Sequence, residues 1–318
     1  MMRRWVLSEY LVLLLSAVYF AVVWPFTAGV SDPANLANIL AAMLPLLVVA
    51  LGQTFVLISR GVDLSVTSTM ALSSVAGAMV MNAETGWMRH SNFAVPVGLT
   101  AMIGVGVLLG SVNGFAVTRL RMPPFLVTLT TMIFVSGLAI LLTKSKNIFG
   151  LPAAFNAIGA SILPAVSVTL FIAVAAHLIL SRTLFGRWLY AVGHNVRTAH
   201  LSGVPTVRVM LGAYMICGMC AAVASVLLTG RLETASPIMG QRMLLDVIGA
   251  TVIGGTSLYG GKGKVLWTVF GVLFLTLIDN TLNLQNLSHF VIMTVKGAVI
   301  LLAAVLDAIR HKLRQADA

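Results

Sequence analysis

Long apolar runs separated by short polar stretches divide the whole chain. A membrane-crossing helix needs about 20 mostly apolar residues at a rise of ~1.5 Å each, and ten segments have that character or approach it. They span residues 6–27, 36–59, 64–82, 93–118, 124–142, 163–180, 207–230, 243–256, 264–283 and 288–309. Two are atypical, because 243–256 is short and glycine-rich and 64–82 carries many serines and threonines. The pattern predicts an all-α polytopic membrane protein with about ten transmembrane helices.

Composition supports this fold class. Apolar residues make up 59% of the 318 residues and charged residues only 9%, whereas soluble domains have about 45–50% and about 25%. Nine acids and twenty bases are too few to cover a water-facing surface of this size. We therefore expect one integral-membrane domain over residues 1–318, with the lipid bilayer as its main surroundings.

The basic residues indicate an orientation. The net charge is +11, but the bases are scattered between apolar runs and form no contiguous basic face, so nucleic acid is not an expected partner. With ten crossings and a cytoplasmic N-terminus, most bases fall in inside loops, as the positive-inside rule requires. We expect a multi-pass membrane protein with both termini in the cytoplasm and an uncleaved first helix.

Ten helices divide into two halves of opposite topology. Inverted repeats of this 5+5 kind recur in transport proteins. A weak internal similarity agrees with it: Gly61 and Asp63 precede the third predicted helix, and Gly240 and Asp246 precede and open the eighth. Each acid lies near a helix N-terminus, where the helix dipole favours negative charge.

No motif indicates an enzyme or a nucleotide site. The glycine-rich segment 254–264 resembles a phosphate-binding loop, but Thr256 and Gly263 stand where a glycine and a magnesium-binding hydroxyl are needed. We interpret it as a flexible cytoplasmic turn. Cys217 and Cys220 lie in an apolar run without a second ligand pair, which favours helix packing over metal binding. We expect no cofactor and no metal on this chain, so any process driven by ATP with Mg²⁺ would need a partner subunit.

Residues 181–206 form the longest hydrophilic stretch predicted to face the cytoplasm. The segment 195–203 within it predicts a short helix, because Asn195 can cap the first turn, Gly203 suits the left-handed position after the last turn and Pro205 prevents continuation. A two-turn helix is marginal in water unless it packs on something. Two interpretations stay open: a helix lying on the protein's own inner face, and a coupling helix that fits a groove on a cytoplasmic partner.

Polar residues inside the predicted spans are costly in lipid and therefore informative. Such neutral groups suit interhelical hydrogen bonds one by one, and together they suit an aqueous path for a neutral, hydroxyl-rich solute. The candidates for this translocation path are Gln53, Asn113, Thr128, Thr131, Thr276, Asn280 and Asn283. A separate strip of glycines at Gly106, Gly110 and Gly114 favours close helix packing within the molecule over a subunit interface.

Two charged residues flank the short outer turn 284–287. Asp279 and Lys296 lie at about 8 and 13 Å below that turn by the rise per residue, and a lysine side chain can extend several ångströms outward. We predict that they form an ion pair whose main role is mutual neutralisation.

Several ordered motifs carry a resemblance to a known family. The segments 61–68 (GVDLSVTS), 112–114 (VNG), 124–132 (PFLVTLTTM), 186–195 (GRWLYAVGHN) and 245–257 (LDVIGATVIGGTS) resemble the permease subunits of bacterial ABC importers for ribose, xylose and related sugars. The resemblance extends over nearly the whole chain. It departs from the usual family pattern where Arg60 and Thr67 replace glycines, His194 occupies a common glycine position and Leu245 replaces an acid.

The resemblance implies a set of partners and roles. It implies that the single domain over residues 1–318 is a permease of the bacterial inner membrane, paired with a second permease that is identical or different. It also implies two cytoplasmic ABC ATPases and a periplasmic sugar-binding protein. The short helix then becomes an ATPase-coupling helix with candidate residues Asn195, Arg197, Ala199, Leu201 and Gly203. The structural motifs of the family fall on Gly61, Asp63, Ser65, Asp246, Gly254 and Gly255.

The expected mechanism is alternating access, with the binding protein docking on the outer loops 83–92, 143–162 and 231–242. Distantly related permeases carry branched-chain amino acids, so an amino-acid substrate stays an alternative. The other alternative is an ion-coupled secondary transporter. Such a transporter requires titratable residues near the membrane midplane, and the sequence offers few of them.

Overall fold

The fold is helical throughout the described part of the chain. The computed structural model describes the backbone of residues 11–316 and the side chains of residues 12–309. Between residues 11 and 316 there is no β-strand, and the only strand-like feature is an isolated antiparallel bridge between Ile148 and Ala235. The all-α fold class predicted from the sequence is therefore confirmed.

The helices follow the predicted order. The first half contains α2 (Leu11–Val23), the 3-10 turn η1 (Trp24–Phe26), α3 (Pro33–Ile58), α4 (Val66–Met81), α5 (Ala94–Thr118) and α6 (Pro124–Thr143). The second half contains α7 (Ala153–Ala160), α8 (Ile162–Arg182), α9 (Leu184–His194), α10 (Val196–Leu201), α11 (Thr206–Leu232), the 3-10 turn η2 (Gln241–Met243), α12 (Leu244–Gly254), α13 (Val265–Leu284) and α14 (His289–Ala316).

Each of the ten predicted spans coincides with a helix, although the predicted start of the first, at residue 6, lies outside the described residues. Among the described residues, seven helices are long and apolar enough to cross a membrane, namely α3, α5, α6, α8, α11, α13 and α14. The chain is thus a multi-pass membrane protein. The helices α2 and α4 are shorter but apolar.

The predicted span 243–256 needs correction. Its helix α12 has 11 residues, which at 1.5 Å rise gives a length of about 16 Å, roughly half of the ~30 Å hydrocarbon core. The helix ends where Gly255 adopts a left-handed backbone conformation with φ of 111°. The helix alone therefore does not cross a bilayer.

The core lies around α3 and α11, whose side chains are mostly buried. The glycine strip of α5 packs directly on α11, so that a side chain at Gly106 would collide with the backbone of Gly218, and one at Gly110 with the backbone of Tyr214. The prediction that this strip serves packing within the molecule is confirmed. In contrast, few side chains of α14 are buried within residues 289–309, and most of its exposed side chains are apolar, as expected for a helix that faces lipid.

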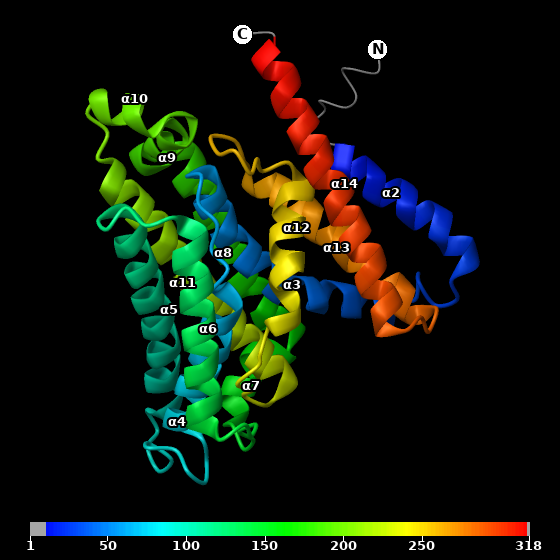
Figure 1. The fold of residues 1–318 in the computed structure, drawn as a ribbon. Coiled ribbons are helices and arrows are strands. Elements are labelled where there is room, and N and C mark those ends of the chain that lie inside the picture. The colour runs from blue at the N-terminus through cyan, green and yellow to red at the C-terminus, as the bar shows by residue number, and fades with distance from the viewer. Residues whose placement is uncertain (1–10, 317–318) are drawn as a thin grey trace.

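Different helices and loops lie at the two ends of the molecule. In Figure 1, α9 and α10 lie at the same end as the start of α2 and the last turns of α14, whereas α7 and the loop after α4 lie toward the opposite end. The described ends of the chain therefore share a side with the short helix α10.

Candidate functional site

The short helix predicted at 195–203 is present as α10 and has the predicted ends. Asn195 Oδ1 accepts a hydrogen bond from the Thr198 N–H at 3.0 Å. At the other end, Gly203 has φ of 83°, its N–H donates to His200 O, and the Val204 N–H donates to Ala199 O, both at 3.0 Å. This pair of bonds after a left-handed glycine is the Schellman ending of a helix.

The five candidate coupling residues do not all face outward. Ala199 is buried against the protein, whereas Arg197 and Leu201 are exposed, Leu201 with 79% of its surface accessible. An exposed leucine on a polar segment gives α10 an apolar contact point. Asn195 and Gly203 shape the ends of the helix, and Ala199 anchors it.

Arg60 joins this region to the end of α3, a role that the sequence did not show. Its Nε donates to Gly193 O and its Nη2 to His194 O, each at 2.8 Å. These carbonyls belong to the last turn of α9, where a cation is favoured by the helix dipole. Arg60 itself has φ of 66°, a conformation that residues other than glycine rarely adopt.

The glycine-rich turn between α12 and α13 completes this junction. The Gly261 N–H donates to Ile58 O at 2.9 Å, and Tyr190 in α9 donates through its hydroxyl to Gly263 O at 2.7 Å. Asp307 Oδ2 accepts from the Leu258 N–H at 3.3 Å. The sequence predicted a flexible turn, but these bonds tie it to α3, α9 and α14. Of the motif glycines, Gly254 packs on the backbone of α13 and Gly255 ends α12.

A buried polar network surrounds the loop that precedes α4. Asp63 Oδ1 accepts from the N–H of Ser65 at 2.9 Å and from its hydroxyl at 2.6 Å. Asn113 in α5 donates to Ser65 Oγ at 2.8 Å and accepts from the Thr131 hydroxyl of α6 at 2.7 Å. Four residues from three elements thus meet at one point, as an interhelical network in lipid requires.

Two further candidates join the same network. With its amide oriented to satisfy both partners, Gln53 in α3 accepts from the N–H and donates to the carbonyl of Asp63, each at 3.2 Å. Thr128 donates to Val62 O at 3.2 Å, and Gly61 packs against the Tyr214 hydroxyl. The sequence had assigned these residues to two separate roles, a translocation path and a structural motif, and the structure brings them together.

The remaining path candidates lie on α13 and do not reach this network. Asn280 exchanges two hydrogen bonds with Asn35 of α3, at 3.0 and 2.9 Å. Asn283 donates to the Asp279 carboxylate at 3.3 Å, and the Thr276 hydroxyl is buried without a partner. Four of the seven predicted path residues therefore meet around Asp63, and the other three lie apart from them on α13.

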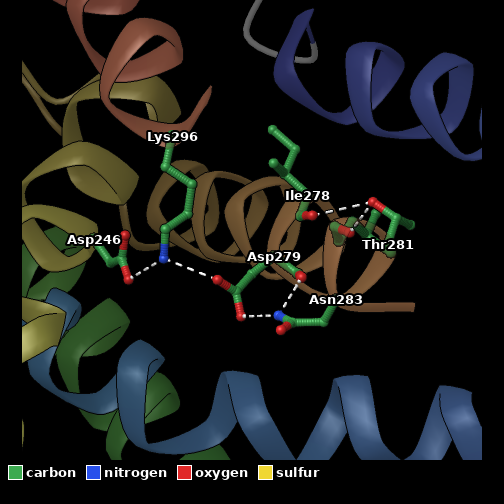
Figure 2. A network of polar contacts seen from close by, with 7 residues as sticks. Asp246, Ile278, Asp279, Thr281, Asn283 and Lys296 are labelled. Atoms are coloured by element: carbon green, nitrogen blue, oxygen red, sulfur yellow. Dashed lines mark hydrogen bonds and ion pairs between the residues drawn. The ribbon is translucent and has the colours of Figure 1, made fainter. Parts of the chain in front are cut away.

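The predicted ion pair is present and has a third member. Lys296 Nζ lies 2.9 Å from Asp279 Oδ1 and 2.8 Å from Asp246 Oδ2. Figure 2 shows the lysine side chain extending from α14 so that its nitrogen lies between the two carboxylates, one from α12 and one from α13. One cation thus connects the last three helices. The sequence had assigned Asp246 to a structural motif, and nothing in it indicated that Asp246 lies next to Lys296 in the fold.

Candidate metal ligands are scattered. Within the described residues, no three His, Cys, Asp or Glu side chains are grouped so that they could hold a metal ion.

Comparisons with known proteins cover nearly the whole chain. Residues 35–304 match the family described as branched-chain amino acid transport system / permease component. The chain is 37% identical over 286 residues to the ribose import permease protein RbsC of Bacillus subtilis (strain 168), covering 87% of this chain and 85% of that protein. It is 31% identical over 315 residues to RbsC of Escherichia coli (strain K12), covering 96% and 95%.

A third relative has a different sugar in its name. The L-arabinose transport system permease protein AraH of Escherichia coli (strain K12) is 33% identical over 318 residues, covering 98% of this chain and 94% of that protein. No solved structure matches the chain.

Proposed function

Because this chain belongs to the branched-chain amino acid transport system permease family, we propose that it is the membrane-spanning subunit of an ATP-driven importer for a monosaccharide. The observation that carries the proposal is the end-to-end similarity to permeases named for ribose and L-arabinose. The family description itself favours a second candidate substrate, a branched-chain amino acid.

The proposed assembly has separate parts for energy, delivery and passage. A cytoplasmic ABC ATPase binds ATP with Mg²⁺, a periplasmic binding protein delivers the sugar, and a second permease, identical or related, completes the membrane part. The chain itself is a transport subunit that binds no cofactor and lies in the bacterial inner membrane with both termini in the cytoplasm. The exposed, well-capped helix α10 supports this scheme, because it offers a cytoplasmic partner a rigid contact.

The mechanism is alternating access. ATP binding brings the two ATPases together, and that movement reaches the spans through α10 and the junction at Arg60. The outer side opens to the loaded binding protein on the loops 83–92, 143–162 and 231–242, and the inner side opens later.

Reconstitution tests the proposal. The chain is purified with its ATPase, placed in proteoliposomes and supplied with the binding protein and labelled ribose, L-arabinose or leucine. We expect uptake of a sugar that requires ATP and stops when the ATPase is inactivated by substitution of its own catalytic residue. Uptake of leucine alone would favour the second candidate, and sugar flux through the chain without the ATPase would refute ATP-driven import.

A further inference from the structure

A cavity of about 460 Å³ lies between α4, α6 and the segment 237–244 that leads into α12. This volume falls within the ~300–1,000 Å³ range of small-molecule sites. The hydrogen-bonding side chains on its wall are Thr67 and Ser68 from α4, Ser136 from α6 and Gln241 from η2. The remaining wall is apolar, with isoleucine and methionine side chains from α6 and from the segment 237–244.

The chemistry of this wall selects a class of solute. Hydroxyl and amide groups both donate and accept hydrogen bonds, and none of the described residues that line the cavity is charged. A neutral solute with many hydroxyls can pair with these groups while its C–H faces contact the apolar side chains. An amino acid would bring an ammonium and a carboxylate into a site without counter-charges, at a large desolvation cost.

The cavity adjoins the buried polar network. Ser68 Oγ donates to Ser65 O at 2.9 Å, and Ser65 in turn binds Asp63 and Asn113. Thr131, which also binds Asn113, immediately precedes the cavity residue Met132. The network thus holds the first turn of α4 and the turn of α6 around Thr131, and with them the α4 and α6 walls of the cavity.

We propose that this cavity is a solute-binding position on the import path, and that it takes a neutral polyhydroxylated solute through Thr67, Ser136 and Gln241. The proposal rests on the proposed function and deepens it. The path residues predicted on α5 and α6 then act one layer behind the solute, as the support of the site.

Cysteine accessibility in the reconstituted importer tests the proposal. The native Cys217 and Cys220 are buried, at 0% and 2% exposure, so the parent chain gives a low background. Ser136→Cys is treated with a small, water-soluble, positively charged thiosulfonate, which reacts with the thiolate. The matched control is Phe134→Cys, on the same helix and 70% exposed but outside the cavity lining.

We expect Ser136→Cys to react at least about tenfold faster than Phe134→Cys, because a thiol in lipid does not ionise. Modification should stop sugar uptake, and an excess of the transported sugar should slow the modification reaction. Gln241→Cys, on the opposite wall, should behave like Ser136→Cys and replaces it if that variant fails to assemble.

The outcomes separate the two levels of the proposal. A parent importer without ATP-dependent uptake of ribose or L-arabinose contradicts the proposed function and, with it, the solute class of the cavity. An active parent in which the cavity cysteines react no faster than Phe134→Cys, or react at a rate unaffected by sugar, overturns the binding position and leaves the function in place.

Discussion

Lys296 is the residue on which the charge balance of the last three helices depends. Its ammonium group contacts two carboxylates, and both Lys296 and Asp246 are largely buried, with 14% and 16% of their side chains exposed, whereas Asp279 has 45% exposed. Without the lysine, two negative groups would remain close together in a partly dry site. Removing one partner of a buried pair is costly because it leaves an uncompensated charge.

Substitution of Lys296 by methionine should therefore lower the stability of the protein. The loss is about 3–5 kcal/mol for a fully buried pair, and we expect less here because the Asp279 carboxylate is half-exposed. Thermal unfolding of the detergent-purified variant measures it.

The control removes all three charges. Lys296→Met combined with Asp246→Asn and Asp279→Asn should recover most of the stability, since no charge is then left unpaired. A triple variant as unstable as the single one would show that the lysine stabilises the helices by packing and not by neutralisation.

At the scale of elements, α10 depends on the backbone conformation at its end. Gly203 has φ of 83° and donates its N–H to His200 O, whereas proline fixes φ near −65° and has no N–H. Gly203→Pro should leave membrane insertion intact but displace α10, so that the ATPase hydrolyses ATP with much less sugar imported per ATP. Gly203→Asn is the matched control, because asparagine tolerates the left-handed conformation. Normal coupling in the proline variant would remove α10 from the mechanism.

The junction between α3 and α9 gives a second element-scale prediction. Arg60 connects the two helix ends through two hydrogen bonds while holding an unfavourable left-handed conformation. Arg60→Gly relieves a strain of about 1–2 kcal/mol and removes both bonds, so we expect a small change in stability together with less sugar imported per ATP hydrolysed.

Arg60→Lys keeps the charge but cannot form both bonds in the same geometry, so it should also lower coupling, to a smaller extent. If both variants import as much sugar per ATP as the parent, Arg60 serves only to cap the C-terminal end of α9.

Local signals in the sequence predicted some elements well and others not at all. The helix α10 was predicted because a cap, a left-handed glycine and a proline all lie within eleven residues. By contrast, α7 and α9 were not predicted as helices, because short helices next to polar loops carry no long apolar run. The run that forms α12 was recognised as short and glycine-rich, but its end was not predicted, since an apolar sequence does not show that Gly255 adopts a left-handed conformation there.

At the scale of the whole molecule, the sequence identified polar residues but not their partners. The residues Gln53, Asn113 and Thr131 were singled out because they are polar within apolar runs. Their meeting around the loop that holds Asp63 and Ser65 depends on how three helices pack. Likewise, the sequence spacing links Lys296 to Asp279 across a short turn, whereas Asp246 lies fifty residues away along the chain. Contacts within one hairpin follow from the rise per residue, and contacts across the bundle do not.

The arrangement in Figure 1, with α10 at one end and the loop after α4 toward the other, predicts which parts of the molecule face each compartment. Trp87 in that loop and Leu201 in α10 are both 79% exposed, so cysteines there form a matched pair. In spheroplasts, a membrane-impermeant maleimide should label Trp87→Cys at once and Leu201→Cys only after permeabilisation. The positive-inside distribution of the basic residues predicts the same orientation. The reverse pattern would contradict the orientation and also the coupling role of α10, because a cytoplasmic ATPase could then not reach it.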